Sequence, residues 1–167
     1  DAIAEATAGI VTATIAAGNA NVLNTALVDS GSQVNAYKIT VSGDNANASD
    51  LLGLDAKTSV KVDATALSVS GIAAQLKELV AAKGVQLAKN VDIKVSDIAV
   101  SASDLGAILK ATTGIVTANV TPSTASALNS ALKDANSSDA LTLKVNGATA
   151  AAKDLISLDG KTSVAIT

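Results

Sequence analysis

Internal repetition restricts the fold of this 167-residue chain more than any other feature of its sequence. The segment Ala6–Ala13 returns at 111–118, 105 positions later, and Leu54–Val60 returns at 158–164, 104 positions later. A third set of matches, at half that offset, is centred on Asp50, Asp104 and Asp154. One unit is therefore about 50 residues long, and the chain holds a little over three units.

Each unit contains short β-branched runs, several of which alternate apolar with polar residues. The clearest runs are Lys38–Ser42, Val60–Asp63, Asp92–Ser96 and Leu141–Val145. A period of two with one apolar face predicts half-buried strands. Strands are accordingly expected near Ile10, Ile39, Val60, Ile93, Ile115, Leu143 and Val164.

Helical stretches are predicted between the strands. In the long connections they are expected at about 20–29, 71–83 and 123–135. In the short connections, Ser49 or Ser103 is expected to cap a helix whose first turn carries an Asp. Gly84 is the expected C-cap of the second long helix.

The resulting order, β-α-β-α repeated along the chain, predicts the α/β fold class. Consecutive strands joined by helical crossovers are normally parallel. We expect a one-sided α/β solenoid with a parallel sheet, in which strands line one surface and helices the other. A row of tandem small βαβα modules is the alternative. The predicted boundaries give a partial repeat at 1–33, repeats at 34–89 and 90–138, and a partial repeat at 139–167.

The apolar half of the chain consists almost entirely of small aliphatic residues. Hydrophobic residues make up 49% of the sequence, yet Tyr37 is the only aromatic residue and Phe, Trp and Met are absent. Side chains of this size fill thin layers better than a thick interior. The composition therefore favours an elongated molecule in which each layer packs on the next.

The charge pattern argues against nucleic acid and membranes as partners. The net charge is −3, and the twelve positive charges are scattered Lys residues without Arg or an aromatic stacking platform. The low isoelectric point, about 4.7, disfavours binding to anionic lipid, and no apolar run reaches the length of a membrane span. The chain has no Cys, so disulfides and thiolate metal sites are excluded.

The sequence offers no recognisable catalytic apparatus, and we expect that the protein is not an enzyme. Without His or Cys, a nucleophile would depend on Lys or a carboxylate as its base, and no serine-hydrolase or phosphate-loop motif occurs. Paired carboxylates do recur, as Asp50 with Asp55 and Asp154 with Asp159. Because an enzyme needs one site rather than one in every unit, we interpret these Asp residues as structural.

Calcium is the metal to consider, because oxygen ligands are the only ones available. Asp44, Asn45 and Asn47 form an Asp/Asn-rich segment that resembles part of a calcium loop. Its counterparts at 97–99 and 147–149 lack the required ligands. A solvated Asx turn is the alternative interpretation. No other cofactor is expected.

The phrase Asp-Leu-x-x-Leu-Asp-x-Lys-Thr-Ser-Val links the chain to a known group. Residues 50–65 match it well, 154–167 match it nearly as well, and 104–121 match it loosely. It is similar to repeats of giant secreted or cell-surface bacterial proteins, frequent in cyanobacteria and often associated with repeat-in-toxin proteins. The resemblance implies an extracellular or cell-surface location and an adhesive or filament-forming role, without implying a ligand.

We therefore expect a structural repeat segment of a large extracellular protein, acting as a spacer or as a self-assembling surface filament or layer. The chain is expected to start inside a helix, at 1–8, and to stop on a strand, at 164–167. Such ends would meet neighbouring repeats, or other copies of the chain, head to tail. The alternative is an adhesive binding module that presents a repeated surface to glycan, ice or another cell. A binding surface would keep one residue type at its solvent-facing strand positions, whereas these vary among Lys, Thr, Asp and Ser.

Overall fold

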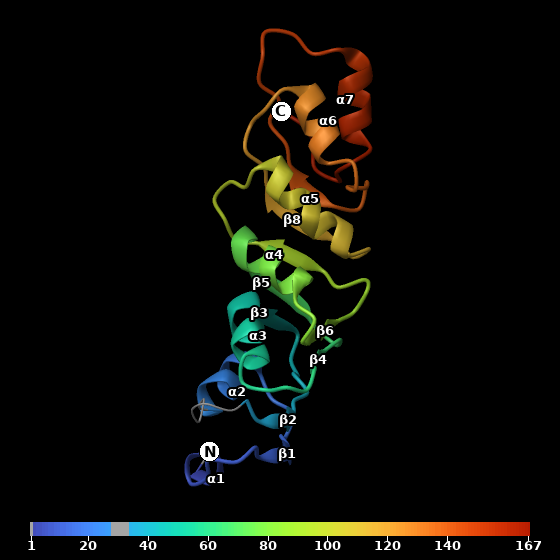
Figure 1. Cartoon of the computed structure of the whole chain (residues 1–167). Helices are drawn as coiled ribbons and strands as arrows, with labels where there is room; N and C mark the ends of the chain where they lie inside the picture. The colour runs from blue at the N-terminus through green and yellow to red at the C-terminus, as the bar shows by residue number, and fades with distance from the viewer. Residues whose placement is uncertain (1, 28–33) are drawn as a thin grey trace.

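The computed structural model describes residues 2–27 and 34–167 and has an α/β fold with parallel strands. The helices are α1 (Ala2–Glu5), α2 (Ala20–Ala26), α3 (Ala48–Asp55), α4 (Ala73–Ala81), α5 (Ala102–Ala111), α6 (Ala125–Ala131) and α7 (Ala152–Asp159). The strands are β1 (Thr12–Thr14), β2 (Ala36–Lys38), β3 (Asn45–Asn47), β4 (Val62–Ala64), β5 (Ser68–Gly71), β6 (Val85–Leu87), β7 (Ile93–Val95), β8 (Val116–Asn119) and β9 (Ala140–Thr142). The helices follow one another along an elongated molecule, from the N-terminal to the C-terminal end (Figure 1).

The pairing of the strands defines the true period of the backbone. Partners in the named strands lie 23 or 24 positions apart, as in Thr12 with Ala36 and Asn45 with Ser68. We call one such passage of the chain, containing one helix and the strand residues beside it, a coil. Each unit of about 50 residues predicted from the sequence therefore corresponds to two successive coils.

Within residues 2–27 and 34–167, the strands form three sheets rather than one. The central sheet has the order β3-β5-β7-β8-β9, and the pairs β1-β2 and β4-β6 stand apart from it. Isolated parallel bridges, such as the one between Thr40 and Asp63, join successive coils outside these sheets. The predicted α/β class with parallel strands is confirmed, while the one-sided solenoid stays a prediction.

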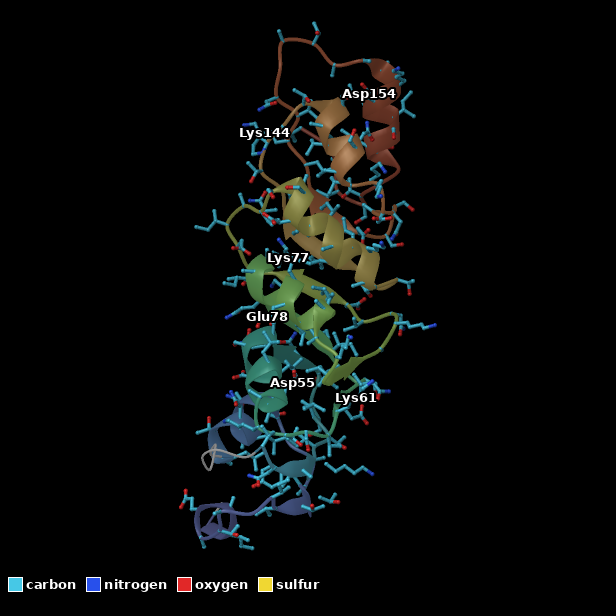
Figure 2. All side chains as sticks on the ribbon, in the orientation of Figure 1. Asp55, Lys61, Lys77, Glu78, Lys144 and Asp154 are labelled. Carbon is cyan, nitrogen blue, oxygen red and sulfur yellow. The ribbon has the colours of Figure 1, made fainter. Side chains whose placement is uncertain are left out.

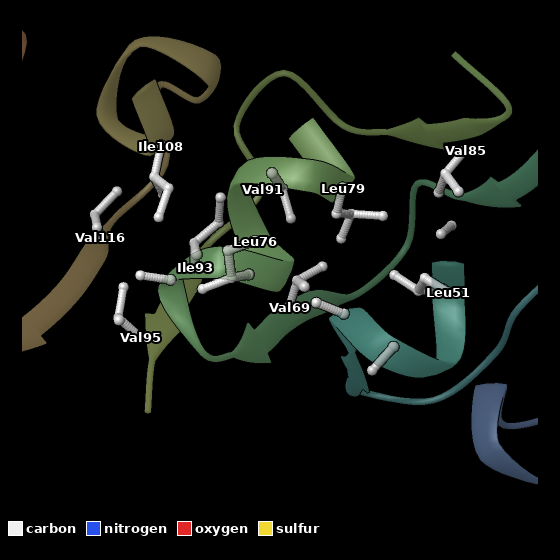
Figure 3. Packing of buried hydrophobic residues seen from close by; sticks show 14 of the residues in the cluster. Leu51, Val69, Leu76, Leu79, Val85, Val91, Ile93, Val95, Ile108 and Val116 are labelled. Atoms are coloured by element: carbon white, nitrogen blue, oxygen red, sulfur yellow. The ribbon is translucent and has the colours of Figure 1, made fainter. Parts of the chain in front are cut away.

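One hydrophobic core extends through the coils and across the predicted repeat boundaries. Buried residues alternate with exposed ones along the strands, as the period of two predicted, and the buried set meets Leu and Ile side chains from the helices. Around α4, Leu76 packs beside Val69 and Ile93, and the cluster continues to Ile108 of the next helix (Figure 3). The pairs β1-β2, β5-β7 and β8-β9 each join residues on opposite sides of a boundary.

Small residues allow successive coils to approach closely. Every described helix begins with Ala, and Ala48, the first residue of α3, is fully buried. A Cβ atom at Gly71 in the following coil would lie 3.0 Å from the Ala48 Cβ. A larger side chain at either position would push the coils apart. This contact shows how small residues permit the thin layers that the Ala-rich composition predicts.

The predicted helix caps were wrong in three places. Ser49 and Ser103 lie inside α3 and α5, one residue past the first. The N-cap of α5 is Ser101, whose hydroxyl accepts a hydrogen bond from the Asp104 N–H at 3.1 Å. Helix α4 ends at Ala81, so Gly84 is not its C-cap. Gly84 is needed for space, because a Cβ there would lie 1.6 Å from the Asp55 Oδ1.

Strand prediction succeeded for all but one of the β-branched runs and missed three other strands. Strands β1, β2, β4, β7, β8 and β9 lie at or near predicted positions, whereas no named strand forms near Val164. Strands β3, β5 and β6 were not predicted. Strand β3 contains Asn and Ala, which are poor strand formers, and pairing with β5 imposes the extended conformation. The part of the first predicted helix beyond residue 27 lies outside the described residues.

Replacing Leu76 by Ala tests the continuous core. The side chain is 0% exposed, so its truncation should lower the free energy of unfolding by about 2–5 kcal/mol. Urea unfolding followed by circular dichroism measures the change. Ile156, which is 73% exposed, provides the control, since Ile156→Ala should change stability by about 0.5 kcal/mol or less. Equal effects of the two substitutions would contradict the described packing.

Candidate functional site

The predicted calcium ligands line the side of a polar hollow between the beginnings of α2 and α3. Its volume is about 460 Å³ and it is open to solvent. The polar residues around it are Asn19, Asn21, Asp44, Asn45, Asn47 and Asp50. Asp44 precedes β3, and Asn45 and Asn47, two positions apart on that strand, have side chains on the same outer face. The structure thus brings the three residues together, with Asp44 just before β3 and with Asn45 and Asn47 on that strand rather than in a loop.

The Asn45 side chain is engaged by the neighbouring strand. Its Nδ2 donates to Ser68 Oγ at 3.2 Å, and its Oδ1 accepts from Ser70 Oγ at 3.0 Å. These contacts place Asn45 in the sheet surface, with its carbonyl oxygen already used. Among residues 2–27 and 34–167, no group of three or more carboxylate, His or Cys side chains is placed to hold a metal. Calcium binding at Asp44, Asn45 and Asn47 stays a prediction.

Comparison along the chain suggests a structural role for Asp44. Asp97 lies 24 residues after Ala73, the first residue of α4, and its Oδ2 accepts the Ala73 N–H at 2.6 Å. Asp44 lies 24 residues after Ala20, the first residue of α2, and lines the same hollow as Ala20. A carboxylate from the following coil is favourable beside a helix N-terminus, where the backbone N–H groups and the macrodipole are positive.

The most elaborate polar contacts occur at a buried threonine in the repeated Lys-Thr-Ser turn. Thr162 is 6% exposed, and its hydroxyl accepts the Leu141 N–H at 3.0 Å and donates to the Leu141 carbonyl at 2.7 Å. Thr58 is 5% exposed and makes the same two contacts with Tyr37, at 2.9 and 2.7 Å. Each hydroxyl therefore joins a turn to the strand of the preceding coil, 21 residues earlier.

A third threonine occupies the equivalent place in the intervening unit. The Thr112 hydroxyl contacts the Val91 carbonyl at 2.6 Å, again 21 residues earlier. Because Thr58, Thr112 and Thr162 are 54 and 50 positions apart, the contact occurs once in every two coils. We call these three residues the threonine clamps. The clamps at Thr58 and Thr162 explain why the Lys-Thr-Ser phrase occurs twice in the sequence.

The residues flanking two of the clamps strengthen the same connection. Lys161 Nζ donates to the carbonyl of Leu132, at the end of α6, at 3.0 Å, which complements the negative end of that helix. Lys57 contacts the Asn24 backbone carbonyl near the end of α2. The Ser163 N–H donates to the Asp139 carbonyl at 2.7 Å, and Ser59 donates equivalently to Asn35 at 2.8 Å.

The recurrent Asp residues in the first turns of α3, α5 and α7 face the preceding helix. Asp50 accepts a hydrogen bond from Asn24 Nδ2 at 3.4 Å, and the carbonyl of Asp154 accepts one from Asn129 Nδ2 at 2.8 Å. Asp104 forms an ion pair with Lys77 at 2.6 Å. The hydrogen bond from Lys77 lowers the pKa of Asp104, and the Ser101 hydroxyl and the Lys77 charge act in the same direction.

The solvent-facing side of the central sheet carries no uniform row of residues. One row across the five strands runs Asn47, Ser70, Lys94, Thr117 and Ala140, each opposite the next in register. Charged side chains are likewise distributed along the length of the molecule, as the labelled Lys61, Lys77, Lys144 and Asp154 show (Figure 2). The described strands of the central sheet therefore present no row of one chemical type.

Comparisons with known proteins assign no family. No family model, curated protein or solved structure matches the chain. Within the described part of the chain, no helix is long and apolar enough to cross a membrane.

Replacing Thr162 by Val tests the threonine clamp. Valine keeps the shape but removes the hydroxyl, leaving the buried Leu141 N–H and carbonyl without that partner, so the free energy of unfolding should fall by about 2–4 kcal/mol. Chemical unfolding measures the loss. Thr162→Ser retains the hydroxyl and should cost only about 1 kcal/mol for the lost methyl group. A serine variant as unstable as the valine variant would refute the clamp.

Replacing Lys77 by Met tests the ion pair with Asp104. Because Lys77 lowers the pKa of Asp104, the substitution should raise that pKa towards its ordinary value, as measured by NMR titration of the carboxyl carbon. The stabilising contribution of the pair is present above the ordinary pKa and is lost as the pH falls through the lowered one. Both groups are half-exposed, so added salt should weaken the effect. Lys144→Met is the control, and an unchanged Asp104 titration in Lys77→Met would disprove the assignment.

Proposed function

We propose that this chain is a structural repeat segment of a large extracellular protein, acting as a spacer or as a self-assembling surface filament or layer. The observation that carries the proposal is the offset of 23 or 24 residues in every pair of named strands. The strand of each coil pairs with the strand of the preceding coil along one edge, and its other edge is placed to pair with the following coil. This arrangement extends the molecule along one direction without needing a partner of another kind.

The contacts between coils support a role in maintaining length. The threonine clamps, the lysines at helix ends and the Asp residues in first helical turns all join one coil to its predecessor. They recur in every second coil and add polar, directional contacts to the apolar core. A spacer needs such contacts, because extension is resisted only by the bonds between successive coils.

The solvent-facing row of the central sheet favours a scaffold over an adhesive module for glycan, ice or another cell. A repeated binding surface would keep one residue type in register, whereas Asn47, Ser70, Lys94, Thr117 and Ala140 differ in size, charge and hydrogen bonding. Ice and glycan surfaces require ordered ranks or aromatic platforms, and this row has neither.

The cellular location and the partner belong to the same proposal. The Lys-Thr-Ser phrase and the repeat length resemble those of giant secreted bacterial proteins, and we assign the chain to the cell exterior or surface on that resemblance. Its partners in this proposal are neighbouring repeats or copies of itself, head to tail. Neither catalysis nor a cofactor has a role in the proposed function.

Electron microscopy of the purified chain over a range of concentrations, with calcium and with chelator, tests the proposal. We expect elongated single particles at low concentration and end-to-end filaments at high concentration, with the same shape in both buffers. Elongated particles that never associate would support the spacer and exclude self-assembly. Compact, roughly spherical particles would contradict both. Filaments confined to the calcium buffer would assign calcium to the hollow around Asp44, and Asp44→Asn should then abolish them.

A further inference from the structure

Three side chains from adjacent coils meet beside α2. Lys57 Nζ lies 2.8 Å from Oδ1 of Asn24, which is a residue of α2. Asn24 Nδ2 donates to Oδ1 of Asp50, in the first turn of α3, at 3.4 Å. All three side chains are partly buried. The amine of Lys57 therefore touches the carbonyl side of the Asn24 amide, and the carboxylate of Asp50 touches its nitrogen side.

The backbone of α3 makes room for the Asn24 amide. A Cβ atom at Gly53 would lie 2.7 Å from both Oδ1 and Nδ2 of Asn24, so only glycine leaves the amide in place. Gly lowers the stability of a helix interior, and its presence here is explained by this close approach. Asn24 is thus held between Gly53, Lys57 and Asp50 in one orientation.

We propose that Lys57 and Asn24 form an intramolecular amide cross-link. The uncharged amine of Lys57 attacks Cγ of Asn24, which is one bond from the oxygen that it contacts. A new Nζ–Cγ bond forms, the Cγ–Nδ2 bond breaks, and ammonia leaves. The attacking nitrogen loses one proton to water and the leaving nitrogen gains one from the Asp50 side, where the carboxylate contacts Nδ2; Asp50 takes that proton from water and ends in its starting state. No oxidant or other reactant is needed.

Proximity is the reason for expecting this reaction here. Uncatalysed aminolysis of an amide is slow, but holding the two groups in contact raises the effective concentration greatly. The bond would join α2 to the turn after α3, fixing two coils to each other. The inference does not depend on the proposed spacer function, although it would reinforce a chain under tension.

The equivalent place 104 to 105 residues later provides an internal comparison. There Lys161 donates to the Leu132 carbonyl, while Oδ1 of Asn129 is buried without a hydrogen-bond partner in the described part of the chain. Ser157 stands where the first site has Gly53. The lysine and the asparagine amide are therefore not in contact at the second site, and no cross-link is expected there.

Mass spectrometry of the intact 167-residue protein tests the proposal. The wild-type chain, folded and incubated at neutral and mildly alkaline pH, should weigh less than its sequence by one ammonia. Peptide mapping should recover the fragments containing Asn24 and Lys57 as one branched species. Lys57→Arg and Asp50→Asn should retain the full mass, since arginine cannot form the bond and asparagine cannot relay the proton. Lys161→Arg, the matched control, should lose ammonia as the wild type does.

The melting temperature and the circular dichroism spectrum show whether a variant lacks the cross-link or has failed to fold. The bond closes a long loop, so the melting temperature of wild type should exceed that of Lys57→Arg by roughly 10 °C. Circular dichroism establishes that each variant is folded before its mass is interpreted. A folded wild-type chain at full mass after alkaline incubation would overturn the proposal. So would an ammonia loss that maps to Asn146–Gly147, where an exposed Asn-Gly pair can form a cyclic imide with the same mass.

Discussion

The structure depends on hydrogen bonds between residues 23 or 24 positions apart. This one offset appears in every pair of named strands, and each coil is extended and held in place by the coil that precedes it. The three-residue strands would not persist alone, because a short strand gains too little from its own backbone bonds. Their stability comes from stacking, so the fold is cooperative along its length and has no single centre.

Side-chain chemistry adds a longer period to this backbone period. Thr58, Thr112 and Thr162 replace part of the strand ladder with a hydroxyl once in every two coils, and the hydroxyls of Thr58 and Thr162 are buried. A hydroxyl can both accept an N–H and donate to a carbonyl of the same residue, which satisfies a buried backbone where the chain turns. Two kinds of coil therefore alternate, and the sequence repeats at about 50 residues although the backbone repeats at about half of that.

The fold class and much of the helix placement could be predicted because they follow from the apolar pattern. Strand β7 and helix α4, for example, have alternating or helical spacing that is visible without any partner. Strand β3 could not be predicted, since Asn45 and Asn47 become extended only by pairing with β5. The same difficulty affected the site, where Asp44, Asn45 and Asn47 suggested a loop.

The threonine clamps correspond to a sequence signal whose structural meaning depends on a neighbouring coil. The Lys-Thr-Ser phrase recurs at 57–59 and 161–163, in phase with the repeat. Recognising that Thr58 and Thr162 are buried required the three-dimensional position of the preceding coil. Exact recurrence of a small polar residue beside apolar ones is, in a repeat protein, a sign of contact between neighbouring repeats.

The two versions of the Lys-Asn-Asp arrangement show how a repeat can diverge in chemistry while keeping its fold. Both sites keep the lysine near a helix end and the asparagine near the following helix. Only the first has Gly53, which brings the Asn24 amide against α3 and into contact with Lys57. A single hydroxymethyl group at one helix position, Ser157 in place of Gly53, thus accompanies the difference between a lysine that only binds a carbonyl and one placed to react. Structural repeats tolerate such changes because each coil is held by its backbone pairing, which leaves individual side chains free to acquire other chemistry.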